Sequence, residues 1–405
     1  MPVAPEKAPR AAKPVASEKP SLPEKIVRLA ARGDGVTASG RFVPMTAPGD
    51  EVSESGVSPG PHRAEPPCRH FPECGGCQFQ HVDDDAYRDY LRDRIASALV
   101  AQGMAVPEMV EPHLSPPRSR RRATLRASGG GIGFNAGASH RIVDMRECHV
   151  LRPELFALVA PLRRLLKGRA NIVMTLADQG VDLLLEGVQV EALEAAEAMA
   201  EFARAQCLAR LAIDDGLGPQ TLWEPEPVTV TLAGVPVALP HKAFLQATAE
   251  GEAALVTTVR AAVGEAGTIA DLFAGLGTFA LALAPERRIY AAEAAREAVL
   301  ALKGAGGSLF VEHRDLYRRP LDVAELDRFE AVVLDPPRAG AREQIARLAV
   351  STVPRIAYVS CNPATFARDA RMLEEGGYRL LWVKPVGQFR WSTHVELVGY
   401  FGRGA

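Results

Sequence analysis

In the C-terminal part of the chain, apolar segments alternate with helical ones, and this alternation constrains the fold more than any other feature. Predicted strands run from Thr268 to Phe273, up to Glu293, and through the segments FEAVVLDPP and RIAYVSCNP. Buried strands joined by helices are typical of a parallel, doubly wound α/β sheet. Ligands of such sheets bind at the carboxyl ends of the strands, so we expect the functional site there.

The first of these strands ends in a glycine-rich turn, DLFAGLGTFA, that leads into an apolar helix. Gly275 and Gly277 allow a sharp turn and a close approach of the backbone to a ligand. With Ala280 the spacing is G-x-G-x-x-A, which also fits a dinucleotide site. Asp271, four residues before Gly275, gives the form D-x-x-x-G-x-G, which resembles the first S-adenosylmethionine (AdoMet) motif of class I methyltransferases.

Acidic residues follow the next two strand regions. Glu293 lies at a strand end, where a carboxylate can accept hydrogen bonds from ribose hydroxyls, and Asp315 in HRDL suits a contact to an adenine edge. These acids favour a nucleotide-containing cofactor over an ordinary tight turn. They do not by themselves separate AdoMet from NAD.

Two further strands end in stiff turns that carry reactive side chains, Asp335-Pro336-Pro337-Arg338 and Ser360-Cys361-Asn362-Pro363. The prolines remove amide donors and restrict the backbone, so Asp335 and Cys361 are expected to face the crevice. A lone cysteine after an apolar strand is usually an inert buried thiol, but the paired turns favour a functional one. Glu396, on the last predicted strand, is the candidate base, and His394 is a weaker one.

Four of the six cysteines form a separate group, Cys68-x5-Cys74-x2-Cys77 with Cys148 further along the chain. Four thiolates suit either a [4Fe-4S] cluster or a structural zinc ion, and the spacing leaves both open. The radical-AdoMet spacing C-x3-C-x2-C is absent from this group. Cys207 lies in a helical stretch and is expected to be an ordinary core residue.

The N-terminal half has a different character. Residues 1–25, rich in Pro, Ala, Lys and Glu, are expected to be a disordered tail without a secretory signal, and the protein to reside in a reducing cytoplasm. Short strands near residues 26–29, 36 and 42–43 predict part of a small barrel. Residues 84–100 have helical periodicity, and residues 110–239 read as a mixed α+β domain.

Composition excludes several classes of protein. Hydrophobic residues make up 47% of the chain and charged residues 24%, as in soluble globular proteins, and no segment has the roughly 20 uninterrupted apolar residues of a membrane span. The formal net charge of −2 gives no global sign of nucleic-acid binding, so an RNA surface must be local. The arginine run Arg118–Arg126 is the candidate for contacts to phosphates.

Five ordered motifs, LPHKAFLQAT, DLFAGLGTFALALA, VVLDPPRAGA, VSCNPATFARD and WSTHVELVGYF, resemble the RNA 5-methyluridine, or uracil-5-, methyltransferases. The resemblance covers roughly residues 25–403 and is strongest to the 23S ribosomal RNA branch. It implies Cys361 as the nucleophile, Glu396 as the base, and Phe244 and Gln246 near the target base. It also implies AdoMet-binding positions at Gln246, Phe273, Gly275, Gly277, Glu293, Asp315 and Asp335.

The chemistry of this reaction requires one reactive cysteine and one nearby base. Carbon 5 of uracil is too poor a nucleophile to take a methyl group directly, but addition of a thiolate to carbon 6 makes an enolate that can attack the methyl of AdoMet. A base must then remove the proton at carbon 5, so that the thiol is eliminated. Cys361 and Glu396 meet these two requirements.

The resemblance also implies that Cys68, Cys74, Cys77 and Cys148 bind a [4Fe-4S] cluster, with a structural role rather than one in methyl transfer. The N-terminal module of this branch is a small OB-like barrel called TRAM, which binds RNA. This sequence matches its first half, through RFVPMTAPGDEV, and reaches the cysteines soon afterwards, so its closing strands are expected to be missing.

The expected fold is therefore a class I AdoMet-dependent methyltransferase domain of the Rossmann-like α/β type at residues 240–405. It follows a disordered tail (1–25), a truncated TRAM segment (26–58) and a cluster-binding, RNA-binding α+β region (59–239). We expect a monomeric enzyme that methylates a uridine of 23S rRNA. A tRNA uracil-5-methyltransferase and a non-catalytic iron–sulfur RNA-binding protein are the alternatives. A cytosine-5 enzyme is disfavoured because Pro337 precedes Arg338 rather than a cysteine.

Overall fold

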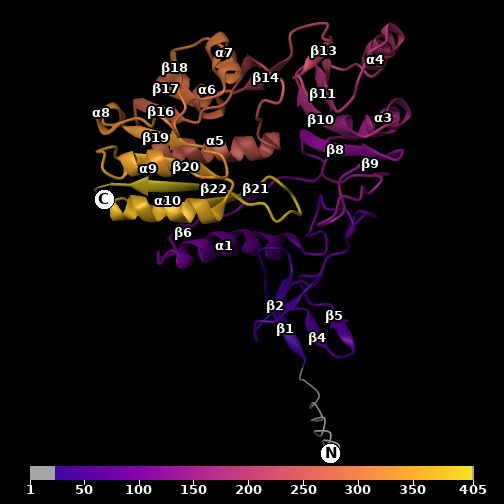
Figure 1. The fold of residues 1–405 in the computed structure, drawn as a ribbon. Coiled ribbons are helices and arrows are strands. Elements are labelled where there is room, and N and C mark those ends of the chain that lie inside the picture. The colour runs from indigo at the N-terminus through magenta and orange to yellow at the C-terminus, as the bar shows by residue number, and fades with distance from the viewer. Residues whose placement is uncertain (1–22, 404–405) are drawn as a thin grey trace, which may run out of the picture.

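The computed structural model describes residues 23–403 (Figure 1). The expected tail lies outside the described residues up to position 22, and the first strand, β1, begins at Glu24. In the part of the chain that is described, no helix is both long enough and apolar enough to cross a membrane.

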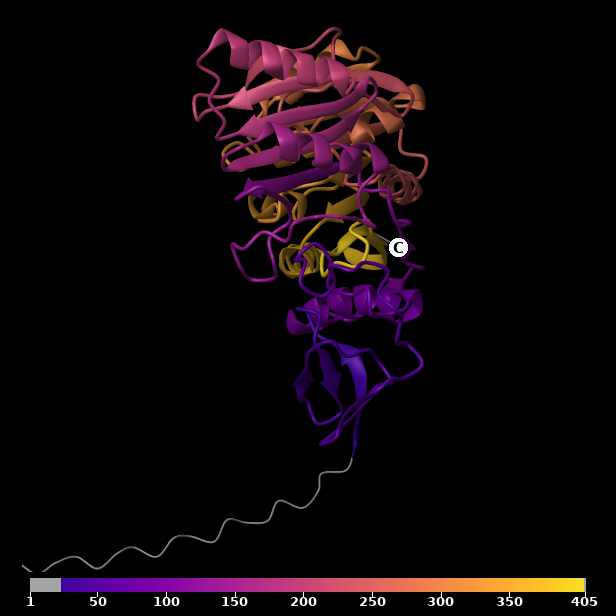
Figure 2. The same ribbon diagram turned by 90° about the vertical axis from the view of Figure 1, so that its right-hand side faces the viewer.

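The N-terminal module is an antiparallel sheet in the order β3-β2-β1-β4-β5. Its strands are β1 (Glu24–Leu29), β2 (Gly35–Thr37), β3 (Phe42–Val43), β4 (Glu51–Ser53) and β5 (Gly56–Ser58). The first three strand regions match the prediction from sequence, whereas β4 and β5 extend the sheet on the other side of β1. Because β3 and β5 are the two ends of this order, the sheet stays open. Figure 1 and Figure 2 show it below α1, apart from the central and C-terminal sheets.

Helix α1 (Asp84–Ala101) follows the cysteine-rich segment, close to the predicted range. Asp83 caps it by accepting a hydrogen bond from the N–H of Ala86 at 2.9 Å, which satisfies one of the free amides of the first turn. Its buried side chains, among them Tyr87, Leu91 and Ile95, recur every four residues and form one apolar stripe. This stripe belongs to the hydrophobic core below the C-terminal sheet, where α1 packs against α10 (Pro363–Glu375) (Figure 1).

The central region contains a mixed sheet in the order β13-β12-β11-β10-β8-β9, as the expected α+β pattern requires. The strands are β8 (Arg122–Ser128), β9 (Gly131–Gly133), β10 (Ala170–Ala177), β11 (Gly180–Glu186), β12 (Arg210–Asp214) and β13 (Gln220–Trp223). Three helices accompany it, α2 (Pro153–Ala157), α3 (Val159–Leu165) and α4 (Leu193–Ala205). The hairpin of β14 (Thr229–Leu232) and β15 (Val235–Ala238) follows and packs in the core of the next domain, against α6 and α7.

The C-terminal sheet has the order β18-β17-β16-β19-β20-β22-β21-β6, and β7 also pairs with β21. The strands are β16 (Thr268–Leu272), β17 (Arg288–Glu293), β18 (Leu309–His313), β19 (Ala331–Leu334), β20 (Arg355–Ser360), β21 (Arg379–Gly387) and β22 (Glu396–Gly402). The first five in spatial order are parallel, and β22 runs antiparallel to both of its neighbours. The short strands β6 (Glu108–Met109) and β7 (His113–Leu114) come from the segment after α1.

Helices cover both faces of this sheet, which is why its strands are almost continuously apolar. Alternate residues of β16 point to opposite faces of the sheet and belong to different hydrophobic cores. Ile269 packs on one face with α5 (Ala249–Val263), α6 (Thr278–Leu283) and α7 (Arg296–Gly304). Ala270 packs on the other face with α8 (Val323–Leu326), α9 (Arg342–Leu348) and α10. A short 3-10 helix, Ala284–Glu286, follows α6. The predicted doubly wound α/β fold is confirmed.

Candidate active site

The structure gathers the predicted strand-end residues at one edge of the C-terminal sheet. Parallel strands end at the same edge, and the residues concerned follow five neighbouring strands. They are Phe273 and Gly275 after β16, Glu293 at the end of β17, Asp315 after β18, Asp335 after β19 and Cys361 after β20. Glu396 reaches the same edge because it is the first residue of the antiparallel strand β22.

Cys361 and Glu396 are neighbours across the pair β20 and β22. Ser360 lies opposite Leu397, so the next residues of the two strands, Cys361 and Glu396, come together just beyond the ladder. The Cys361 thiol has a pKa raised to about 11, first by burial and then by the negative charges of Glu396 and Asp335. A thiol and a carboxyl group therefore influence each other directly at this edge.

Glu396 is almost fully buried, with 7% of its surface exposed. Burial raises its pKa to about 8, and the neighbouring Asp335 carboxylate adds to this rise. The amide of Gln388 and the positive charge of Arg338 act in the opposite direction. A carboxyl group with a pKa near the working pH is well suited to take up and release a proton.

The turns after β19 and β20 are bound to each other. The side-chain amide of Asn362 donates to the carbonyl oxygen of Arg338 at 2.9 Å, and the hydroxyl of Thr365 donates to the same oxygen at 3.1 Å. Asn362 also caps α10 by accepting from the N–H of Ala364, while Pro363 occupies the first helical position. The S-C-N-P motif thus fixes the backbone on which Cys361 stands.

Asp335 directly follows β19 and is contacted by Gln246. The Nε2 atom of Gln246 donates to an oxygen of Asp335 at 3.4 Å. Burial raises the pKa of Asp335 to about 7. Gln246 is itself buried and reaches the sheet edge from the segment that precedes α5.

The glycine-rich turn adopts the predicted sharp geometry. Gly275 and Gly277 have φ angles of 55° and 92°, in the left-handed region that favours glycine. A Cβ atom on Gly277 would lie 2.4 Å from Leu302, whereas one on Gly275 would point into open space. Gly277 is therefore required for packing against α7, and Gly275 leaves room beside the turn.

Two acids hold this turn. One oxygen of Asp271 accepts from the N–H of Ala280 at 2.8 Å, and its other oxygen is buried without a hydrogen-bond partner. Burial raises the pKa of Asp271 to about 8. The Glu293 carboxylate accepts from Gly275 N–H at 2.9 Å and from Ala295 N–H at 2.7 Å. Each Glu293 oxygen keeps a further lone pair that can accept from a hydroxyl.

Phe273 has a φ angle of 65°, which is unusual for a residue other than glycine. Its ring lies against Tyr317, with 5.5 Å between the ring centroids, and the Tyr317 hydroxyl donates to the carbonyl of Gly340 at 3.0 Å. The Asp315 carboxylate accepts from the N–H of Tyr317 at 3.0 Å. Tyr317, which the sequence analysis missed, thus joins the ends of β18 and β19 beside Phe273.

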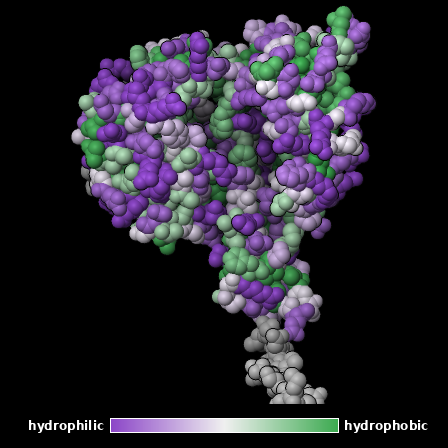
Figure 3. All heavy atoms as spheres, viewed as in Figure 1, coloured by the Kyte–Doolittle hydropathy of each residue, from purple (hydrophilic) through white to green (hydrophobic). Residues whose placement is uncertain are grey.

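Phe244 and Gln246 lie on the segment that leads into α5, and Phe244 is 61% exposed. The guanidinium of Arg122 lies 5.1 Å from the Phe244 ring centroid. Both Phe244 and Arg122 line a cavity between this segment and strands β8 and β10, together with Arg120, Ala247 and Phe389. Figure 3 shows the surface hollowed between the two upper lobes. An exposed ring beside an arginine can hold a nucleobase by stacking.

The arginine run is more structural than expected. The guanidinium of Arg121 donates to the carbonyl of Gln246 at 2.9 Å and to the Glu252 carboxylate at 2.5 Å. Arg122 donates to the carbonyl of Leu245 at 2.9 Å. These contacts within the protein disfavour a phosphate contact for Arg121, because its charge is paired with Glu252. Arg118 and Arg126 at the ends of the run are exposed.

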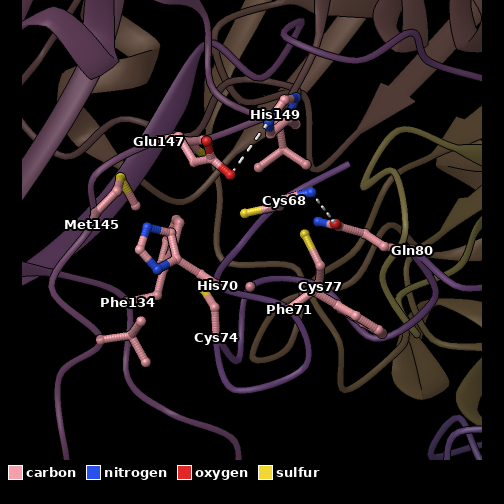
Figure 4. A pocket seen from close by; sticks show the side chains of 14 residues that line it. Cys68, His70, Phe71, Cys74, Cys77, Gln80, Phe134, Met145, Glu147 and His149 are labelled. Carbon is pink, nitrogen blue, oxygen red and sulfur yellow. Dashed lines mark hydrogen bonds and ion pairs between the residues drawn. The ribbon is translucent and has the colours of Figure 1, made fainter. Parts of the chain in front are cut away.

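The four grouped cysteines line one cavity, although they come from two distant stretches of the chain (Figure 4). Phe71, Phe134 and Met145 contribute apolar side chains to the same cavity. The loop between Cys74 and Cys77 is attached to the segment that follows β9, because Gly75 N–H donates to the carbonyl of Asn135 at 2.9 Å. Within residues 23–403, no three His, Cys, Asp or Glu side chains converge as ligands of a single metal ion. Cys207 is exposed, contrary to the prediction of a core residue.

The cysteine segment also touches the loop that precedes Glu396. The N–H groups of Gln78 and Phe79 donate to the carbonyl of Trp391 at 2.6 and 3.0 Å. The Tyr87 hydroxyl of α1 donates to the carbonyl of Ser392 at 2.9 Å. This loop also carries His394, whose ring packs against Phe389. The segment beside Cys77 therefore supports the active-site loop directly.

The strand order, the glycine turn with its acids, and the reactive edge define a class I methyltransferase. A family model described as tRNA (Uracil-5-)-methyltransferase matches residues 310–402. An uncharacterized RNA methyltransferase of Zymomonas mobilis is 54% identical over 393 residues, covering 93% of this chain and 99% of that protein. One of Caulobacter vibrioides is 38% identical over 418 aligned residues, covering 93% of this chain and 99% of that protein. The chain belongs to the RNA (uracil-5-)-methyltransferase family.

A solved structure has the same overall fold. Pyrococcus abyssi tRNA (uracil-54, C5)-methyltransferase, in complex with S-adenosyl-L-homocysteine, matches with a TM-score of 0.72 and 23% sequence identity. The match covers 94% of this chain and 100% of that chain. The likeness therefore extends beyond the C-terminal sheet to the N-terminal and central regions.

Proposed function

We propose that this protein transfers a methyl group from AdoMet to carbon 5 of a uridine in RNA, through a covalent bond between Cys361 and carbon 6 of the uracil. The observation that carries the proposal is the pairing of Cys361 with Glu396 at the edge of the sheet, next to Asp335. The reaction needs one sulfur nucleophile and one base on the same ring, and these side chains supply both.

The proposed steps use these two side chains in turn. The Cys361 thiolate adds to carbon 6, and the electron pair of the double bond moves onto the oxygen at carbon 4. Carbon 5 of this enolate attacks the methyl group of AdoMet. The bond between this methyl group and the sulfur of AdoMet breaks, and S-adenosylhomocysteine leaves. Glu396 then takes the proton from carbon 5, the double bond re-forms, and the bond between sulfur and carbon 6 breaks.

The cofactor assignment rests on the turn after β16 and its acidic partners. Glu293 is held by two backbone N–H groups and keeps lone pairs for ribose hydroxyls. Phe273 gives an apolar wall, and the open space beside Gly275 allows a ligand to approach the backbone. Asp315, Asp335 and Gln246 complete the proposed AdoMet site.

The test is an assay of methyl transfer from labelled AdoMet to RNA of a strain that lacks this protein. We expect 5-methyluridine to form with the wild-type protein and no product or covalent adduct with Cys361→Ala. The matched control is Cys207→Ala, which changes an exposed cysteine outside the site. A fully active Cys361→Ala variant would contradict the proposed mechanism, and a protein inactive on every RNA would favour the non-catalytic alternative.

We place the target uridine in 23S rRNA, because the motif set and the four grouped cysteines resemble the ribosomal RNA branch. A tRNA target is the second candidate, since the matching family model is described as tRNA (Uracil-5-)-methyltransferase. Mapping 5-methyluridine by mass spectrometry in both RNAs of a deletion strain distinguishes them. Loss from 23S rRNA alone supports our assignment, and loss from tRNA alone overturns it.

We also propose that Cys68, Cys74, Cys77 and Cys148 hold a [4Fe-4S] cluster. The four thiols fit this group because they line one cavity together with the apolar side chains of Phe71, Phe134 and Met145. The thiolates of a [4Fe-4S] cluster bind four different irons, so they need not converge as zinc ligands do. The cluster would tie the segment after the N-terminal module to the central sheet.

Anaerobic purification with iron and sulfide analysis tests this assignment. We expect about four irons and four sulfides per chain, and loss of both in Cys77→Ser but not in the Cys207→Ser control. Stoichiometric zinc without sulfide would overturn the cluster. We further propose the predicted division into residues 1–25, 26–58, 59–239 and 240–405, with the first boundary moved to before β1 and with β6, β7 and the β14–β15 hairpin assigned to the C-terminal domain. We propose a single chain as the active unit and the cavity beside Phe244 as part of the RNA-binding surface.

A further inference from the structure

Gln388 lies in the loop between β21 and β22, eight residues before Glu396 in the sequence but next to it in space. Val386 is the partner of Glu396 in the ladder between these strands. Side chains two residues apart on an extended chain point to the same side, so Gln388 emerges on the side of Glu396. Only 2% of its surface is exposed, so its amide has no access to bulk water.

The amide of Gln388 can adopt only one orientation. Its Oε1 atom accepts from the backbone N–H of Ala247 at 2.9 Å, and this N–H cannot act as an acceptor. The Nε2 atom of Gln388 must therefore face the other way, and it donates to Oε1 of Gln246 at 2.8 Å. The Nε2 atom of Gln246 in turn faces Asp335. One backbone amide thus fixes the direction of the whole chain of hydrogen bonds.

This orientation leaves a donor for the candidate base. The Nε2 group of Gln388 has two hydrogens, and Gln246 uses one of them. Burial raises the pKa of the Glu396 carboxyl, and the nearby amide of Gln388 lowers it. Close packing holds Gln388 in place, because a Cβ atom on Gly251 would lie only 2.6 Å from its Cβ.

We propose that Gln388 is a positioning residue that orients the Glu396 carboxylate for removal of the proton at carbon 5. This inference rests on the proposed function, because it assigns a role within that reaction. Gln388 does not contact the reacting atoms in this assignment. Its effect is on the last step, in which the covalent bond between Cys361 and the RNA is broken. The first two steps, addition and methyl transfer, do not need a base at carbon 5.

The test compares Gln388→Met with Gln344→Met in single-turnover reactions on RNA from a strain lacking the enzyme. Gln344 is a buried glutamine that makes two hydrogen bonds to the backbone of Leu321, away from the site, so its replacement is a matched control. We expect release of methylated RNA to slow about 10- to 100-fold in Gln388→Met. The denaturation-resistant protein–RNA adduct should accumulate only in that variant.

A second variant separates donation from packing. Gln388→Glu keeps the shape and the acceptor for Ala247 N–H but loses the amide donor, so it should accumulate the adduct as Gln388→Met does. Normal release by Gln388→Glu, or equal release by Gln388→Met and Gln344→Met, would overturn the proposal. Weaker AdoMet binding without adduct accumulation would also overturn it, because Gln388 would then act on Gln246. A wild-type protein that forms neither product nor adduct would contradict the proposed function instead.

Discussion

Glu396 begins β22 directly beside Cys361 at the end of β20, and its carboxylate helps to raise the pKa of the Cys361 thiol. The Glu396 carboxylate therefore opposes ionisation of the Cys361 thiol in the ligand-free protein. Any ligand that separates their charges, or spreads the thiolate charge into a ring, relieves this repulsion.

Replacing Glu396 by glutamine should trap the reaction after methyl transfer. The amide of Glu396→Gln keeps the shape of the side chain but cannot accept the proton from carbon 5, so product release should fall about 100- to 10,000-fold. A stable protein–RNA adduct should appear on denaturing gels with methylated RNA bound. The control is Glu330→Gln, which lies just before β19 at the opposite edge of the sheet. Full turnover by Glu396→Gln would assign the base to another residue.

The rate of adduct breakdown should depend on pH. Burial raises the pKa of Glu396 to about 8, and the reaction needs the ionised form, so breakdown should speed up as the pH rises through about 8, where it is half-maximal, and level off above that pH. Following a pre-formed adduct after a pH jump isolates this step from ionisation of Cys361. The Gln388 variants should shift the midpoint upward, because the Gln388 amide lowers the Glu396 pKa. A midpoint near the ordinary glutamate value would contradict the burial argument.

Alanine at the two glycines of the AdoMet turn should have different effects. Gly277→Ala places a Cβ 2.4 Å from Leu302 and strains a residue with φ of 92°, so we expect the free energy of unfolding to fall by about 2–4 kcal/mol. Gly275→Ala meets open space, and its strain should cost only about 1 kcal/mol. Its main effect should be weaker AdoMet binding. Chemical denaturation and calorimetric titration measure the two effects, and equal stability losses would contradict this distinction.

The ion pair between Arg121 and Glu252 should contribute to stability, since only 14% and 15% of these side chains are exposed. It joins the segment before β8 to α5, so each single alanine variant should unfold more easily than the wild type. A double-mutant cycle in urea should give a coupling energy of about 1 kcal/mol. RNA affinity should not fall further in Glu252→Ala than its stability explains. If only Arg121→Ala loses RNA binding, Arg121 contacts a phosphate after all.

The strand-end residues could be predicted from sequence because each is tied to a local pattern. Asp335 and Cys361 lie in proline-containing turns, and Gly275 and Gly277 lie in a turn that requires glycine. The local backbone conformation at each residue could therefore be predicted from its sequence neighbours. The topology of a parallel sheet then brings these ends together without further information. The class I fold and the family were predicted correctly for this reason.

The residues that sequence reasoning missed or misread act through contacts between distant segments. Gln388 binds Gln246 from 142 positions away, and Arg121 reaches Glu252 across 131 positions. Nothing near Gln388 distinguishes it from any polar residue in a loop, apart from its place between an apolar strand and the candidate base. Strands β4 and β5, each three residues long, were not predicted as separate strands.

Helix α1 and strands β6 and β7 complete the C-terminal sheet, although more than half of the chain separates them from β21 and α10. During synthesis, the apolar stripe of α1 therefore emerges from the ribosome long before the surface that covers it. The Tyr87 hydroxyl can form its hydrogen bond only after Ser392, 305 positions further along the chain, has been synthesised. Such non-local pairing slows folding and exposes apolar surface to other chains. A fragment starting at residue 240 would lack the edge strands, so the methyltransferase domain cannot be obtained by simple truncation.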